Sequence, residues 1–245
     1  MIYMQTAHFG LKKLPRSITK FFLLIFLGFS IADAKEDNLY LRFDAGRIKQ
    51  SNNINSTQHF YKVSGNKKLK RDFIYIFGLG YRINKYLRTD LTFSKADNLN
   101  YISSVKSPKA FNTYFQNFEI QSTLLNFYYD FPFDKIISPY IGIGIGYSKI
   151  SPNIGIHKLK TNSGREGLNK VYNKISNSFS YALLGGLTIK ANEKFEFDFN
   201  YKFQDFGNSN GIYKIEDFSG NIMSRNPESF KIKANIVTLS VRYNF

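Results

Sequence analysis

Eight basic residues in two long segments have the types and spacing best suited to bind an acidic partner. Residues 48–71 contain six Lys or Arg residues and no acid, and residues 149–176 contain six against Glu166 alone. Clustered cations attract phosphates, sulfates and acidic proteins. The candidate binding residues are Lys62, Lys67, Lys68, Lys70, Arg71, Lys158, Lys160 and Arg165.

Residues that could carry out catalysis are few. The histidines are His8, His59 and His157, and the chain has no cysteine, which excludes thiol catalysis, disulfides and cysteine zinc sites. The sequence contains no HExxH, P-loop or Gly-x-Ser-x-Gly motif. We therefore predict a protein that is not an enzyme and that has no cofactor and no metal site.

A second set of charged residues recurs at alternate positions of apolar segments. In Phe195 to Phe206, aromatic residues occupy every odd position up to Phe203, and the even positions are polar. Successive side chains of a β-strand point to opposite faces, so this segment has one apolar and one polar face. The charged residues that we place on polar faces are Arg42, Asp44, Arg82, Arg88, Asp90, Asp130, Lys190, Glu196, Asp198, Lys202 and Arg242.

Eight segments alternate in this way, and each is long enough for one membrane-crossing strand of about ten residues. They are residues 39–46, 73–82, 87–94, 120–130, 140–148, 179–190, 195–206 and 232–245. After Ala34 no segment approaches the roughly 18 apolar residues of a spanning helix. The mean hydropathy is −0.30, which also argues against a helical membrane protein. We predict an all-β fold, an eight-stranded antiparallel transmembrane β-barrel with its apolar faces turned to lipid.

The charged residues on the polar faces would then line a narrow lumen. The set holds six basic and five acidic residues, and pairing among them would offset the cost of burying charge. We predict a structural salt-bridge network, and the alternative is a proton path or a catalytic site. A wide channel is not expected, because the interior of an eight-stranded barrel is filled by its own side chains.

The connections alternate between short and long. Residues 83–86, 131–139 and 191–194 form short connections, whereas residues 48–71, 95–117, 149–176 and 205–231 form long ones. Outer-membrane barrels have short periplasmic turns and long external loops. We therefore expect four long external loops, less regular than the strands, and both chain ends in the periplasm.

The N-terminus has the order of a secretory signal peptide. Lys12, Lys13, Arg16 and Lys20 precede an apolar core at 21–29, and Ala32-Asp33-Ala34 is an Ala-x-Ala cleavage signal. We predict a cleaved signal peptide at 1–34 and a barrel domain at 35–245, exported to the outer membrane of a Gram-negative cell. The alternative, an N-terminal membrane anchor, requires a longer apolar segment.

Five short segments of the expected strands resemble those of a known family: residues 39–46, 77–82, 126–131, 139–147 and 199–203. The longest of them, residues 139–147, reads Pro-Tyr-Ile-Gly-Ile-Gly-Ile-Gly-Tyr. They resemble the opacity-type (OmpA/OmpX-like) family of small outer-membrane barrels. The many Lys, Ile, Asn and Phe residues make the chain most similar to rickettsial surface adhesins. This resemblance implies adhesion to host proteins, possible ligands being serum or matrix proteins such as vitronectin.

We therefore expect a surface adhesin that binds a host surface or serum protein through basic external loops. The other expected partners are outer-membrane lipid or lipopolysaccharide, and the barrel-assembly machinery, which would recognise the terminal Phe245. Nucleic acid is not expected. One alternative is a structural barrel whose lysines only keep the surface soluble and bridge membrane phosphates. A second alternative is a lipid-modifying enzyme of the outer membrane.

Overall fold

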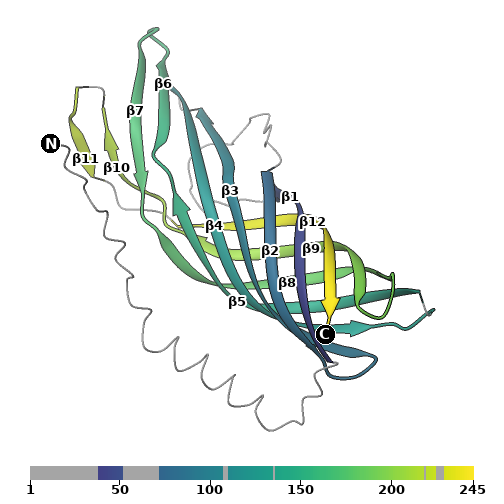
Figure 1. The fold of residues 1–245 in the computed structure, drawn as a ribbon. Helices are drawn as coiled ribbons and strands as arrows, with labels where there is room; N and C mark the ends of the chain where they lie inside the picture. Colours follow the sequence, from purple (N-terminus) through teal and green to yellow (C-terminus); the bar gives the residue numbers. More distant parts are fainter. Residues whose placement is uncertain (1–37, 52–71, 107–109, 135, 218, 225–228) are drawn as a thin grey trace, which may run out of the picture. The chain divides into compact units, whose positions relative to one another are not determined.

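The computed structural model describes residues 38–245 apart from 52–71, 107–109, 135, 218 and 225–228. Its strands form one antiparallel sheet (Figure 1). They are β1 Leu39–Gln50, β2 Asp72–Arg82, β3 Leu87–Lys106, β4 Ala110–Asp130, β5 Ile137–Pro152, β6 Gly155–Thr161, β7 Glu166–Asn173, β8 Ser176–Lys190, β9 Phe195–Ser209, β10 Ile212–Glu216, β11 Ile222–Ser224 and β12 Phe230–Asn244. Within the described ranges, no helix is long and apolar enough to span a membrane.

Eight of these strands close into a ring. The order is β1–β2–β3–β4–β5–β8–β9–β12, and β12 pairs with β1 to complete the circle. Leu41 lies opposite Tyr243 at this closure, and Leu125 of β4 lies opposite Ile145 of β5. The predicted all-β antiparallel barrel is confirmed.

Period-two alternation decides which side chains face the lumen. On β9, Phe195, Phe197, Phe199 and Tyr201 are 41–51% exposed on the outer face, whereas Glu196, Asp198, Asn200 and Lys202 between them are 2–6% exposed. Small residues on the inner face make room for large neighbours. A Cβ atom at Gly80 would overlap the Tyr40 ring, and one at Gly142 would lie 2.7 Å from the Tyr128 ring.

The prediction of long irregular loops is wrong for the described parts of three of them. β3 and β4 continue past the ring as a hairpin, with pairs from Leu99 opposite Phe118 to Lys106 opposite Phe111. Strands β6, β7, β10 and β11 extend the sheet from the outer part of β4, and we call these four strands the flap (Figure 1). The many lysines hid a regular alternation, in which Ile156, Lys158 and Lys160 face one way and His157 and Leu159 the other.

The lumen is not polar along its whole length. Near the flap the inner positions are apolar and form a buried cluster that we did not predict. On several strands the alternation is reversed at this level, as at Ile48 between Arg47 and Lys49, so that the apolar residue points inward and the charged residues point outward. Its members are Ile48, Ile74, Ile76, Ala96, Leu99, Phe118, Ile120, Ile150, Phe206, Ile232, Ala234 and Ile236. The charged side chains lie between this cluster and the end of the ring that carries the short connections, which we call the turn end.

Candidate functional site

Arg42 of β1 is the centre of the first group of lumen ion pairs. Its Nη2 lies 2.7 Å from Asp44 Oδ2, and its Nη1 lies 3.0 Å from Asp90 Oδ2 on β3. Nη1 also donates a hydrogen bond of 2.9 Å to the Tyr128 hydroxyl. Between β1 and β3, the residue opposite Arg42 is Gly78 of β2, whose missing side chain lets the arginine cross to the third strand.

Arg242 of β12 is the centre of the second group. Its Nη2 lies 3.0 Å from Glu196 and 2.8 Å from Asp198, both on β9, and it donates a 2.8 Å hydrogen bond to Thr188 Oγ1. Arg82 of β2 approaches Glu196 from the other side, at 2.9 Å. The closure of the ring therefore places one carboxylate between two arginines that are distant in the sequence.

Arg88 of β3 lies between two aromatic rings. Its Nε is 2.9 Å from Asp130 Oδ2, and its guanidinium carbon is 4.0 Å from the centre of the Tyr128 ring and 4.5 Å from that of Tyr140. Both Nη atoms are buried with no hydrogen-bond partner among the described residues. The position of Tyr40, Tyr128 and Tyr140 on inner faces followed from alternation, but their stacking against arginines did not.

Two of the charged residues that we placed in the lumen stand apart from these groups. Lys202 is buried, and no carboxylate of the described chain lies within 4 Å of its amino group. Lys190 is exposed at the turn end. The remaining nine residues join in ion pairs.

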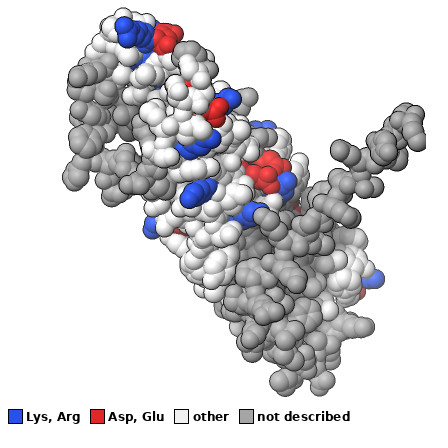
Figure 2. All heavy atoms as spheres, turned by 90° about the vertical axis from the view of Figure 1, so that its left-hand side faces the viewer, with Lys and Arg blue, Asp and Glu red and all other residues white. Residues whose placement is uncertain are grey.

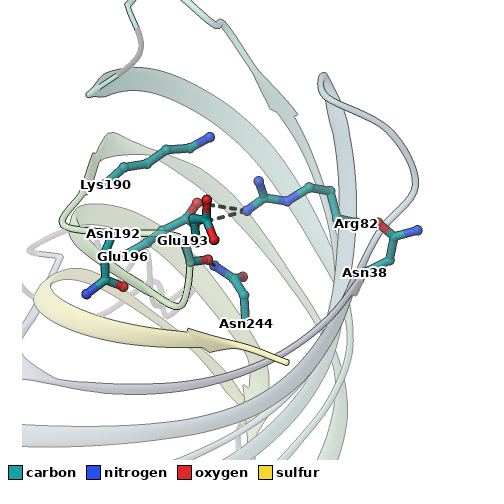
Figure 3. A pocket seen from close by; sticks show the side chains of 7 residues that line it. All are labelled: Asn38, Arg82, Lys190, Asn192, Glu193, Glu196 and Asn244. Atoms are coloured by element: carbon teal, nitrogen blue, oxygen red, sulfur yellow. Dashed lines mark hydrogen bonds and ion pairs between the residues drawn. The ribbon is translucent and has the colours of Figure 1, made fainter. Parts of the chain in front are cut away.

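A polar cavity of about 480 Å³ opens at the turn end (Figure 3). Its wall includes the Arg82–Glu196 ion pair, and the Lys190 side chain points into it. The other lining residues are Asn38, Asn192, Glu193 and Asn244. Cations, carboxylates and amides are mixed in this wall, so it favours no single class of charged ligand.

Three of the predicted binding residues lie on the flap. Lys158 and Lys160 are exposed on β6, and Arg165 lies in the turn before β7. Lys160 pairs with Glu166 at 2.9 Å, and Lys158 lies 5.2 Å from the centre of the Phe115 ring. The predicted residues Lys62, Lys67, Lys68, Lys70 and Arg71 lie outside the described residues.

The flap also holds Lys170, which sequence reasoning did not select. It lies opposite Ile156 in the β6–β7 register, and therefore on the same outer face as Lys158 and Lys160. Leu168, opposite Lys158, adds an exposed apolar side chain to this face. Figure 2 shows basic side chains spread over one side of the described sheet, several with an acidic side chain beside them.

Two flap carboxylates are held by their neighbours in the ionised form. Hydrogen bonding to Lys160 lowers the pKa of Glu166, and the positive charge of the same lysine adds to this. The Tyr172 hydroxyl, which donates a 2.8 Å hydrogen bond to Glu216, lowers the pKa of Glu216, and Lys170 and Lys214 add to the effect. The flap cations are therefore partly neutralised at neutral pH.

Comparisons with known proteins agree with this architecture. A family model described as "Outer membrane protein beta-barrel domain" matches residues 21–245. No curated protein matches the chain.

Similar solved structures include Neisserial surface protein A, at 18% identity over 84% of this chain and 97% of that chain, with a TM-score of 0.47. OprG from Pseudomonas aeruginosa is 16% identical over 85% and 97%, with a TM-score of 0.46. Ail, the attachment invasion locus protein of Yersinia pestis, is 14% identical over 84% and 96%, with a TM-score of 0.34.

Proposed function

The chain belongs to the outer-membrane β-barrel family, and from this premise we propose that it is a surface adhesin that binds an acidic host protein. The binding surface in this proposal is the outer face of the flap, together with Lys62, Lys67, Lys68, Lys70 and Arg71. The identity of the host protein, for which vitronectin is one candidate, rests on family resemblance alone.

The observation that carries the proposal is the regular placement of cations on the flap. Lys158, Lys160 and Lys170 project from paired strands, in register with Leu168, Glu166 and Ile156. Backbone pairing holds their Cα atoms in place, so binding would order only the side chains. Apolar residues between the lysines add contact area, as recognition of a protein surface requires.

The charge of this face is only partly satisfied within the flap. Lys160 has Glu166 at 2.9 Å, and Lys170 has Glu216 at 3.6 Å. Lys158 has no carboxylate within 4 Å in the described part of the flap, and its ammonium instead approaches the Phe115 ring. Exposed pairs of this kind contribute about 0–1 kcal/mol, so an acidic partner could replace them at little cost.

A second candidate function is a structural barrel without a dedicated ligand. Two observations favour it: the lumen charges pair with one another, and several flap lysines already have carboxylate neighbours. The lipid-modifying enzyme has no comparable support, since His157, the histidine that the structure describes, lies on β6 beside Asn112 and outside the ring.

The test is binding of the refolded barrel to a panel of purified serum and matrix proteins, vitronectin included. We compare wild type with Lys158→Gln/Lys160→Gln/Lys170→Gln and with a segment variant, Lys67→Gln/Lys68→Gln/Lys70→Gln. The control is Lys85→Gln/Lys194→Gln, which removes exposed cations at the turn end. We expect a tenfold or greater loss of affinity in at least one of the two test variants and none in the control. Unchanged binding in both, or no saturable binding by wild type, favours the structural barrel.

A further inference from the structure

The outer face of the ring changes from apolar to cationic at one level of β1 and β12. Outward side chains of β1 are apolar from Leu41 through Ala45, and the next two are Arg47 and Lys49. On the neighbouring β12 they are apolar from Tyr243 back to Val237, and Asn235, Lys233 and Lys231 follow. An apolar belt that ends abruptly marks the boundary of the hydrocarbon region of a bilayer.

Four cations beyond this boundary lie on two hydrogen-bonded strands. Arg47 is opposite Val237 and Lys49 is opposite Asn235. The Ser51 amide donates a 2.7 Å hydrogen bond to the Lys233 carbonyl, so Lys233 lies one step beyond Lys49 on the same face. We call Arg47, Lys49, Lys231 and Lys233 the cation patch.

The patch keeps most of its charge. Asp205 of β9, 3.5 Å from Lys233, is the one carboxylate within 4 Å of its amino and guanidinium groups in the described chain. Arg47 lies over the Phe73 ring, 4.9 Å from its centre, which fixes the guanidinium without neutralising it. The net charge of the patch with Asp205 is therefore positive.

The other described ring strands offer at most a single outward cation at this level. On β3, Lys95 is flanked by Asp97 at 3.3 Å and Glu119 at 3.5 Å. On β5, Lys149 is exposed, and its neighbours in register on β4 and β8 are the uncharged Gln121 and Asn177. On β9 the residue in register with Lys233 is Asp205. Within the described ring strands, neighbouring outward cations are therefore grouped on β1 and β12.

We propose that the cation patch is a binding site for the phosphate groups of an outer-leaflet glycolipid, whose acyl chains lie on the apolar belt below. Phe43, Val237, Leu239 and Tyr201 form the adjoining apolar surface, and they are exposed on the outer face. A phosphate at this depth meets lysine ammonium groups and an arginine that can donate two parallel hydrogen bonds. The site does not depend on the proposed adhesion, because it lies on the ring and not on the flap.

The experiment measures lipid retention by the refolded barrel in phosphatidylcholine nanodiscs. The probes are bisphosphorylated hexa-acyl lipid A, the same lipid without phosphates, and phosphatidylglycerol. Lys49→Gln/Lys231→Gln is the test variant, and Lys85→Gln/Lys194→Gln removes the same charge at the turn end. Each surface cation contributes about 1 kcal/mol toward anionic lipid, so we expect a roughly 10- to 30-fold loss of lipid A affinity in the test variant.

The control variant should retain wild-type affinity, and wild type should bind the phosphate-free lipid as weakly as the test variant binds lipid A. Lys49→Arg/Lys231→Arg should keep the affinity, which separates charge from folding defects. Wild-type affinity in the Gln variant, an equal loss in the control, or equal binding of the phosphate-free lipid would overturn the site. Equal binding of phosphatidylglycerol would overturn its assignment to a glycolipid.

Discussion

Arg42 Nη1 lies 3.0 Å from Asp90 Oδ2, although the two residues belong to strands separated in the ring by β2. The contact is possible because Gly78 of β2 lies opposite Arg42. Since glycine has no side chain, the arginine side chain can cross over β2 to reach β3. The same guanidinium binds Asp44 on its own strand. One arginine therefore joins the inner faces of β1 and β3 and forms ion pairs with two buried carboxylates.

The first prediction concerns the removal of this arginine. Arg42→Gln should lower the free energy of unfolding by about 3–5 kcal/mol, because Asp44 and Asp90 would remain buried without their cation. Urea titrations of the refolded barrel, followed by circular dichroism, measure the change. Lys85→Gln, at an exposed position of the turn end, should change stability by less than about 0.5 kcal/mol. A loss for Arg42→Gln no larger than that of Lys85→Gln would contradict the role we assign to Arg42.

Alternation predicted the ring strands and the inward position of the charged residues, because a period of two depends on neighbouring residues only. It did not predict the partners. Whether Arg42 meets Asp90, or Arg82 meets Glu196, depends on the register between strands and on where the ring closes, and both are set by the whole barrel.

The extent of the strands was predicted less well. Arg47 and Lys49 mark the end of the belt on β1, yet lysine-rich composition placed residues from 48 onward in a loop. The flap strands were missed for the same reason, since Lys158 and Lys160 alternate with residues whose burial depends on β4 and β7. The burial of a flap side chain depends on the neighbouring strands, so the sequence of a single flap strand gives little indication that it is a strand.

The second prediction tests the close packing of the lumen. Gly80→Ala places a methyl group on the Tyr40 ring, and overpacking of this kind costs about 1–3 kcal/mol. Gly167→Ala on β7 is the matched control, since a Cβ atom there meets nothing closer than 4.0 Å. Thermal unfolding followed by the heat-dependent shift on gels compares the two. Equal stability of both variants would show that Tyr40 can move aside without cost.

The third prediction is that the barrel conducts no ions. An apolar cluster that contains Ile76, Ile120 and Ile150 fills the lumen near the flap, and the ion pairs of Arg42, Arg88 and Arg242 fill it below. Planar-bilayer recordings of the refolded wild type should show no steady conductance. The Ile120→Ala variant should also show no steady conductance, because the ion-paired side chains still fill the lumen. Regular single-channel steps from wild type would contradict this description of the interior.

The fourth prediction is an acid-dependent loosening of the β7–β10 pair. Glu216 on β10 accepts a hydrogen bond from Tyr172 and lies 3.6 Å from Lys170 and 3.9 Å from Lys214. The Tyr172 hydroxyl and these cations lower the pKa of Glu216 in the paired flap relative to a detached β10. A lowered pKa means that the carboxylate stabilises pairing above its ordinary pKa of about 4.3, and that the contribution is lost as pH falls through the lowered value.

Amide hydrogen exchange, corrected for intrinsic rates, measures this at the backbone of 212–216 between pH 6 and pH 3. Wild type should lose protection toward the acidic end of that range. At pH 6, Glu216→Gln should already show the reduced protection that wild type shows only at the acidic end of the range. Asp217 also has a lowered pKa, caused chiefly by a hydrogen bond from the Asn221 side chain, so Glu216→Gln is compared with Asp217→Asn. If the pH dependence survives in Glu216→Gln and disappears in Asp217→Asn, the turn before β11, and not the β7–β10 pair, is the acid-sensitive element.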